Sequence, residues 1–393
     1  MASVRSAGPG FSPLDEGLGL KPGSSLTPWL LDSIVLLGTQ LSFGRLPALL
    51  AHFTGVRVSA ETVRRLTEAA GALVVAHETA VVCELEHTLP EPPAGPPLQQ
   101  LSVDGAMVPL RNGAWAEVKT VVLGTVADGH ATDLSYFSRK TDAETFARLA
   151  TGETHRRGTS TAGPVVAVSD GATWCQRVVD WHRPDAVRIL DLPHALEHLG
   201  KVAQMCFGPA TATASTWLEE QGMALRAGRL DDVLTALHDL AVQHTSAPST
   251  HAVVLQTHAY LATRRPQVQY QAFVAAGYPI GSGAVESANK LVVEARLKGA
   301  GMHWAETHID PMLALRTHLL NNRWEEGRAV VAQAWRQHRP VASAGSPPVP
   351  KLRASRPPLA GPPSAPARPA TIVHDKPTAE HPWRKSSPFP AKR

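Results

Sequence analysis

The chain has 393 residues, of which 43% are hydrophobic and 18% charged, so it is long enough for a large core and for two or three domains. This composition excludes a collagen, a coiled coil and a wholly disordered protein. Because no run of about 18 apolar residues occurs and no apolar leader follows a basic N-terminus, we expect no membrane span and a cytoplasmic protein.

The net charge of +4 is unevenly distributed along the chain. Residues 341–393 contain nine Lys or Arg and two acidic residues, which leaves 29 basic against 32 acidic residues in residues 1–340. The same tail holds 13 of the 33 prolines, so we predict that it is disordered. A basic tail of this kind either holds nucleic acid through phosphate contacts or only aids solubility.

The N-terminal part of the chain is predicted to be helical. Residues 1–25 are rich in Gly, Pro and Ser and are expected to form a flexible arm. Residues 26–88 are expected to form an all-α module, which ends at a Pro-rich linker over residues 89–98.

Two helices are expected inside this module. The first, over residues 46–53, would stop at Gly55, and Ser59 would cap the second. The segment over residues 55–65 therefore suits the turn and second helix of a helix-turn-helix, although a plain helical hairpin is the alternative. Three basic residues would lie on or near the exposed side and contact DNA: Arg57, Arg64 and Arg65.

Strand-like sequence follows the linker. Residues 101–110, 118–126 and 133–137 are expected to form three meandering strands. The elements expected next are a helix over 142–151, a strand over 165–168, a helix over 172–182 and a strand over 187–190. This order, β-β-β-α-β-α-β, predicts an α/β fold with a mixed sheet covered by helices. Mostly helical sequence then continues, and a last long helix is expected over residues 284–298.

Three acids lie at informative places on this scaffold. Asp104 lies inside the first strand, where a carboxylate needs a charged partner or a metal. Asp170 ends the fourth strand, at the edge where open α/β sheets form their sites, although a turn or cap role is common there. Glu286 opens the last helix beside a glycine-rich turn that attracts anions, and a first-turn Glu also stabilises any helix.

If the first and fourth strands are neighbours, these three carboxylates would converge. They would then hold two Mg²⁺ or Mn²⁺ ions roughly 3.5 to 4 Å apart. One ion would activate a water or a 3′-hydroxyl, and the other would stabilise the leaving oxygen of a phosphodiester. Such a site would perform strand cleavage and strand transfer.

Five segments of the sequence, in order, resemble one family. The segments "LSVDGAMVPL", "WAEVKTVVLG", "VSDGATWCQ", "ILDLPHALEHL" and "YPIGSGAVESANKLVVEARLKGAGMHW" are similar to the bacterial insertion-sequence transposases of the ISKra type, within the DDE superfamily. The resemblance runs over residues 11–335. It implies an RNase H-like catalytic domain in two parts, residues 99–192 and 279–340, separated by a helical insertion over residues 193–278.

The resemblance also implies the site and the partners. Asp104, Asp170 and Glu286 would be the catalytic and metal-binding triad, acting at terminal inverted repeats of a mobile element. The partner would be double-stranded DNA, both transposon ends and target, bound by a homodimer or larger assembly associated with the nucleoid.

Further residues are expected near the site or on the DNA. Asp191 and His194 fit an Asp-x-x-His pattern that many DDE transposases place after the fifth strand. Asn289 and Lys290 lie one helical turn after Glu286 and would meet the scissile strand. Two basic residues would follow the DNA backbone unless they are only solvated surface charge: Arg296 and Lys298. Three tryptophans would stack on an unpaired base or, as an alternative, pack in the core or on the surface: Trp174, Trp304 and Trp324.

Two alternatives are left open by the sequence. His194, Glu197 and His198 fit H-x-x-E-H, the pattern of a zinc peptidase class, although the histidines could also simply cap and pack a helix. A domesticated or inactive transposase that only binds DNA is the main rival.

Overall fold

The computed structural model describes residues 26–337, 372–373 and 376–377. The chain divides into two compact units, Met1–Pro340 and Val341–Arg393. In the second unit, β6 (Ile372–Val373) and β7 (Lys376–Pro377) pair antiparallel. The predictions of a flexible arm over residues 1–25 and of a disordered tail fall mostly on residues outside those described.

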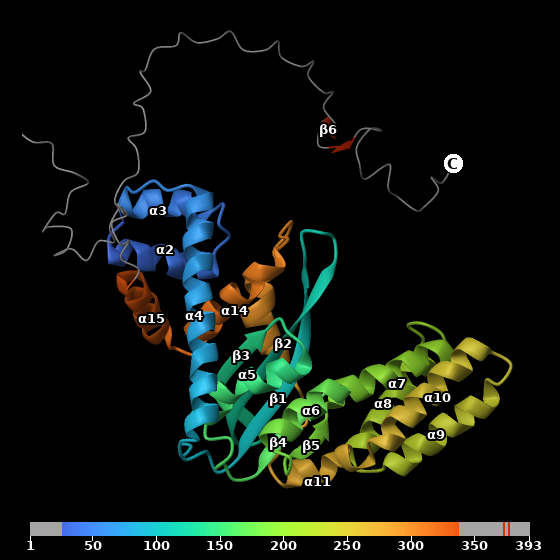
Figure 1. The fold of residues 1–393 in the computed structure, drawn as a ribbon. Helices are drawn as coiled ribbons and strands as arrows, with labels where there is room; N and C mark the ends of the chain where they lie inside the picture. Colours follow the sequence, from blue (N-terminus) through green and yellow to red (C-terminus); the bar gives the residue numbers. More distant parts are fainter. Residues whose placement is uncertain (1–25, 338–371, 374–375, 378–393) are drawn as a thin grey trace, which may run out of the picture. The chain divides into compact units, whose positions relative to one another are not determined.

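A five-stranded mixed sheet forms the centre of the first unit (Figure 1). Its strands are β1 (Gln99–Pro109), β2 (Trp115–Ala127), β3 (His130–Arg139), β4 (Val165–Ser169) and β5 (Val187–Leu190). The spatial order is β3-β2-β1-β4-β5; β1 to β3 are antiparallel, and β4 and β5 run parallel to β1 and to each other. The predicted α/β fold with a mixed sheet is therefore confirmed.

Helices cover both faces of this sheet. Because side chains alternate along a strand, Leu101 and Val103 of β1 face α5 (Ala143–Arg156) and α6 (Thr173–His182). Ala106 and Val108 face the opposite side, where α14 (Ile309–Leu320) and the segment before it pack. Asp142 caps α5 by accepting a hydrogen bond from the Thr145 amide, as the predicted helix start requires.

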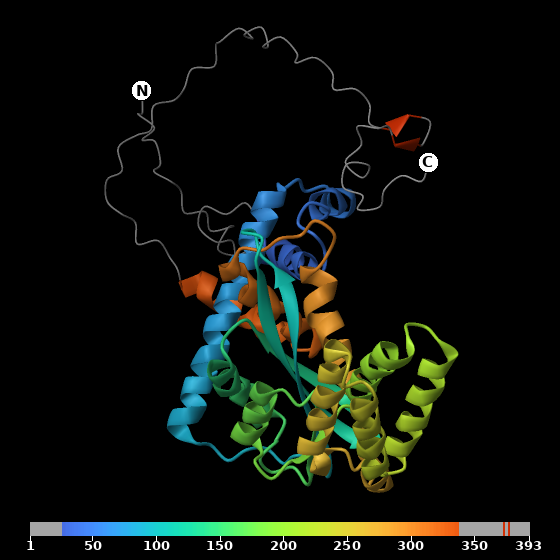
Figure 2. The same cartoon turned by 90° about the vertical axis from the view of Figure 1, so that its right-hand side faces the viewer.

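Five helices follow β5. They are α7 (Leu192–Phe207), α8 (Ala212–Arg226), α9 (Leu230–Gln243), α10 (Pro248–Thr263) and α11 (Tyr270–Ala275), with a short 3₁₀ turn, η1 (Arg265–Gln267). They share one apolar cluster with β4 and β5, and α7 to α10 lie together to one side of the sheet (Figure 2). This helical group therefore packs against the end of the sheet formed by β4 and the edge strand β5.

The N-terminal helices are α2 (Pro28–Gln40), α3 (Leu46–Thr54) and α4 (Ala60–Thr88). As predicted, Gly55 ends α3 in the left-handed region, with φ 72°, and Ser59 caps α4 by accepting from the Thr62 amide. The segment between α4 and β1 is irregular, as expected for a Pro-rich stretch. It is held in place because the Gly95 amide donates to the Thr161 hydroxyl at 2.9 Å.

Helix α4 is long and apolar enough to cross a membrane by length and composition alone. In the structure it packs instead against α2, α5, α14 and α15 (Trp324–Gln337), and it runs beside the sheet in both views (Figures 1 and 2). Val74 of α4 belongs to a buried cluster that includes Leu315 and Val331 from the C-terminal helices. Helix packing therefore buries one side of α4, and 33% of its most apolar stretch is buried.

The last long helix is not continuous, contrary to the prediction for residues 284–298. It consists of α12 (Gly283–Ala288), a π-helical segment η2 (Asn289–Glu294) and α13 (Ala295–Leu297); a 3₁₀ turn, η3 (Glu306–His308), follows. The buried Arg316 donates to the carbonyls of Leu291 and Val292, which satisfies backbone groups of the widened turn. A tertiary contact therefore supports this irregularity.

Candidate active site

Asp104 and Asp170 lie on neighbouring parallel strands. The β1–β4 register ends with Ser102 opposite Val168, two residues before each aspartate, so continuing it places Asp104 opposite Asp170. Both side chains point to the same face of the sheet, because the alternation that buries Val103 and Ala167 on one face turns the aspartates to the other. The predicted convergence of these two acids is therefore supported by the strand pairing.

Asp104 is held by two hydrogen bonds. Its Oδ1 accepts from the Gly105 amide at 2.7 Å, and its Oδ2 accepts from Asn289 Nδ2 at 2.8 Å. Burial raises the pKa of Asp104, and the negative charge of Asp170 raises it further, although the two hydrogen bonds and His194 act in the opposite direction. Ionisation of Asp104 is therefore less favourable in the folded protein than for an exposed aspartate.

The loop after β4 is fixed by the helical group. Asp170 Oδ1 accepts from the Ala172 amide at 2.8 Å, while the Tyr260 hydroxyl donates to the Asp170 carbonyl at 2.7 Å. Arg264 donates to the carbonyl of Gly171, whose φ of 79° favours glycine. Residues of α10 and the turn that follows it therefore position this carboxylate.

Asp191 and His194 form a second charged pair, close to Asp104 and Asp170. The buried Asp191 accepts from His194 Nδ1 at 2.6 Å and from the Ser282 amide at 2.6 Å. The hydrogen bond and charge of Asp191 raise the pKa of His194 to about 9, and Asp170 and Glu197 contribute to the rise. His194 therefore carries a positive charge at neutral pH, close to Asp191, Asp170 and Asp104.

Glu286 lies beside Asp191 and His194. The Ser282 hydroxyl donates to Glu286 Oε1 at 2.7 Å, and within residues 26–337 the group with ligand atoms all within 4.8 Å of one another is Asp191, His194 and Glu286. Glu286 therefore lies next to Asp191 and His194. The physical reason is that Ser282, bonded to both Asp191 and Glu286, holds Glu286 on the side of His194.

Asn289 and Lys290, three and four residues after Glu286, have different surroundings. Asn289 is buried and donates to Asp104, and its Oδ1 has no hydrogen-bond partner. Lys290 is exposed. Asn289 therefore positions a carboxylate, whereas it was predicted to meet the scissile strand.

The predicted DNA-contacting residues differ in accessibility. Arg57 and Arg65 are exposed, while Arg64 pairs with Glu61 and Glu68 at 2.5 Å each. Lys298 is exposed but bonded to Glu294 at 2.6 Å.

Arg296, which was expected either to follow the DNA backbone or to be solvated surface charge, does not lie on the surface. Its side chain is only 2% exposed, because it packs over the rings of Phe43 and Trp304.

The zinc-peptidase pattern does not form a zinc site in the described part of the chain. His194 donates to Asp191, and the ring of His198 stacks on Tyr260 with centroids 4.1 Å apart. No group of three close ligands in the described ranges includes His198. Since zinc takes neutral imidazoles and at least three protein ligands, the structure does not favour this alternative.

Sequence reasoning missed three positioning residues. Ser282 was seen only as part of a glycine-rich turn, yet it lies four residues before Glu286, a spacing that brings side chains together on a helix. Tyr260 and Arg264 act through backbone carbonyls, which no local pattern marks.

No protein-family model matches the chain, and no curated protein matches its sequence significantly.

Proposed function

We propose that the protein is a metal-dependent DNA transposase of the DDE superfamily, similar to the ISKra type, with an RNase H-like catalytic domain. The observation that carries the proposal is that Asp104 lies in β1 and Asp170 directly follows the parallel neighbouring strand β4, and that the charge of Asp170 raises the pKa of Asp104. The element order β-β-β-α-β-α-β agrees with the α/β fold expected for the catalytic domain, and it supports the RNase H-like assignment.

The acids fit a divalent cation. Burial and the charge of Asp170 both oppose ionisation of Asp104, and a cation held by these two carboxylates would offset both effects. Oxygen ligands suit Mg²⁺ or Mn²⁺. When bound, two such ions would activate the attacking hydroxyl or water and stabilise the leaving oxygen.

The remaining residues have roles that follow from their contacts. Asn289 orients Asp104, and Asp191 keeps His194 protonated next to both aspartates, where an imidazolium can meet a phosphate oxygen. Glu286 is the third acid of the proposal, held by Ser282 beside this imidazolium. Arg57 and Arg65 would contact double-stranded DNA, residues 193–278 would position it, and a dimer or larger assembly would pair two ends.

The test is cleavage of duplex DNA bearing the terminal inverted repeats, with Mg²⁺ or Mn²⁺. We expect Asp104→Asn, Asp170→Asn and Glu286→Gln each to reduce cleavage by roughly a hundredfold or more while leaving DNA binding intact. Glu144→Gln, at an exposed position of α5, is the matched control and should cut normally.

The outcomes separate the rival function. A variant that cuts normally would remove that residue from the catalytic set. A parent protein that binds the repeats but cuts with neither metal would instead support an inactive transposase that acts as a DNA-binding protein.

A further inference from the structure

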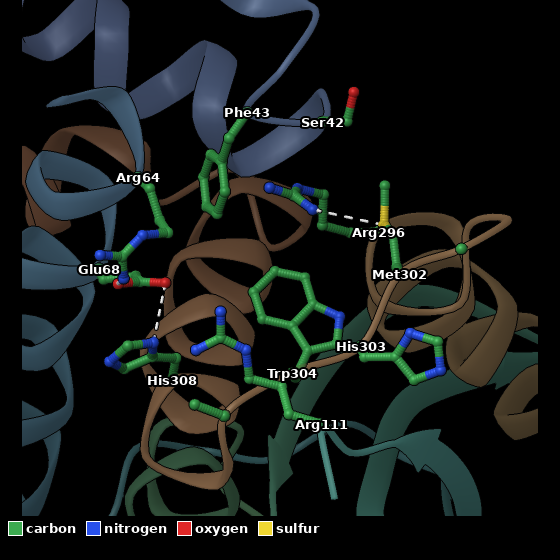
Figure 3. Close-up of a pocket in the computed structure, with 12 residues that line it drawn as sticks. Ser42, Phe43, Arg64, Glu68, Arg111, Arg296, Met302, His303, Trp304 and His308 are labelled. Carbon is green, nitrogen blue, oxygen red and sulfur yellow. Dashed lines mark hydrogen bonds and ion pairs between the residues drawn. The ribbon is translucent and has the colours of Figure 1, made fainter. Parts of the chain in front are cut away.

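A cavity of about 230 Å³ is lined by none of the acidic residues of the candidate active site (Figure 3). It forms where four parts of the chain meet: the loop between α2 and α3, helix α4, the turn between β1 and β2, and the segment from Arg296 to His308. Its size is below the roughly 300–1,000 Å³ typical of drug-sized ligand sites, so it suits a small group.

A buried arginine lines this cavity with an unused donor. Arg296 donates through Nε to the Gly38 carbonyl at 3.1 Å, and its guanidinium packs over Phe43 at 4.5 Å and Trp304 at 5.1 Å from the ring centres. Its Nη2 has no hydrogen-bond partner. A buried donor without an acceptor destabilises the fold, so the position calls for an acceptor from outside the chain.

The charge of Arg296 persists at neutral pH. Burial, with a smaller contribution from Arg316, lowers its pKa to about 10. The carboxylate in the cavity, Glu68, is already paired with Arg64 at 2.5 Å and with His308 at 3.0 Å. Arg111 is exposed at the turn between β1 and β2 and adds a second cation (Figure 3). The cavity therefore favours an anionic group.

The rest of the wall is apolar and aromatic. Phe43 and Trp304 meet edge to face with centroids 6.1 Å apart, and Met302 lies beside them (Figure 3). The wall is held in place because Trp304 Nε1 donates to the Leu297 carbonyl and the Arg111 amide donates to the Trp304 carbonyl, both at 3.0 Å. The cavity is therefore formed before any ligand arrives.

Cations next to aromatic rings are the combination that binds single-stranded nucleic acid. We propose that this cavity binds one unpaired nucleotide of a DNA strand, with its phosphate at Arg296 and Arg111 and its base against Phe43, Met302 and Trp304. The inference rests on the proposed function, since DNA supplies the ligand. Arg296 lies in α13, which is joined through η2 to α12, the helix that carries Glu286.

The test measures binding of a fluorescein-labelled six-nucleotide thymidine strand to the full chain by fluorescence anisotropy, with EDTA present so that no cleavage occurs. We expect Arg111→Ser and Phe43→Leu each to weaken binding by roughly fivefold or more. Arg45→Ser is the matched control, because Arg45 is exposed close to the cavity but does not line it. It should change the dissociation constant by less than about twofold.

A second probe isolates the base. An abasic strand of equal length and charge should bind the parent protein roughly fivefold more weakly, and Phe43→Leu should remove that difference. Equal effects of Arg111→Ser and Arg45→Ser, or equal binding of the two strands, would overturn the inference. Thermal unfolding of each variant confirms that it is folded.

The inference and the proposed function fail in different ways. If the acid variants abolish cleavage while Arg111→Ser and Phe43→Leu bind like the control, only the inference is lost. If the chain binds neither the six-nucleotide strand nor the duplex repeats, both are lost.

Discussion

Asp104 is predicted to lower the stability of the folded chain in the absence of divalent metal. Because its pKa is raised on folding, the folded state is favoured below the ordinary value of 3.8, and this advantage is lost as the pH rises through the higher folded value. Asp104→Asn removes the charge, and Asn289 can rotate its amide so that its unpartnered Oδ1 accepts from the new amide. We expect the urea midpoint at pH 7 with EDTA to stay equal or rise.

Divalent metal should reverse this ranking. A cation that binds the folded parent stabilises it by mass action, so Mg²⁺ or Mn²⁺ should raise its unfolding midpoint and leave Asp104→Asn unchanged. Midpoints measured with and without metal check both statements. A large loss of stability for Asp104→Asn in EDTA would contradict the view that its charge is unfavourable.

His194 should make stability depend on pH in the neutral range. Its pKa rises from 6.5 to about 9 on folding, so its contribution is complete below pH 6.5 and is lost as the pH rises to about 9. The side chain is 35% exposed, so solvent screening reduces the effect to about 1–2 kcal/mol. Urea unfolding at pH 6, 7.5 and 9 measures it.

The matched variants identify the source of this dependence. His194→Gln removes the titrating ring and should flatten the decrease between pH 6.5 and 9. His238→Gln, at an exposed position of α9, should keep the decrease of the parent. An unchanged decrease in His194→Gln would contradict the assignment to the bond with Asp191.

Single residues of the site were predictable where chemistry and position coincide. Asp104 stood out because a carboxylate inside a strand needs a reason, and Asp170 because it ends a strand at the edge where sites form. The bond from Ser282 that holds Glu286 beside His194 depends on a side-chain rotamer. Sequence spacing does not determine rotamers, so this contact of Glu286 with Ser282 and its position beside His194 were not predicted.

At the scale of elements, two glycines in helices should respond oppositely to the same substitution. A Cβ at Gly71 of α4 would lie 2.2 Å from the Pro311 carbonyl oxygen, whereas a Cβ at Gly200 of α7 would lie 3.6 Å from the Leu218 side chain. Ala is favoured over Gly inside a helix by about 0.5–1 kcal/mol. We expect Gly200→Ala to stabilise by that amount.

Gly71→Ala should instead destabilise by about 1–3 kcal/mol, because backbone has to move where α4 crosses α14. Denaturant unfolding of both variants measures the difference. Equal stabilisation by the two substitutions would contradict the close crossing of these helices.

Most elements followed from local patterns, and the exception is informative. The β-branched runs of the sheet, Gly55 as a helix stop and Ser59 as a cap were predicted because their signals are local. The π-helical turn over Asn289–Glu294 was not, since its carbonyls are satisfied by Arg316, which is distant in sequence. Asn289, which donates to Asp104, lies in the same π-helical turn that Arg316 contacts.

At the scale of the whole unit, the N-terminal helices share a core with the C-terminal ones. The sequence suggested a separate module over residues 26–88, because composition changes at the Pro-rich stretch. In the structure, Val35 and Val74 of that region are buried with Ala314, Leu315 and Val331. Amphipathic faces show that a helix is buried, but not which partner buries it.

This shared core predicts a single unfolding transition for residues 26–337. Val74→Asp places a charge in the buried contact between α4 and the C-terminal helices, and it should destabilise the whole unit by about 3 kcal/mol or more. Ala76→Asp adds the same charge at an exposed position of the same helix and should cost less than about 1 kcal/mol. Circular dichroism and tryptophan fluorescence should shift together in Val74→Asp. Two separate transitions would instead show that the N-terminal helices fold as an independent module, and the shared core would then not govern stability.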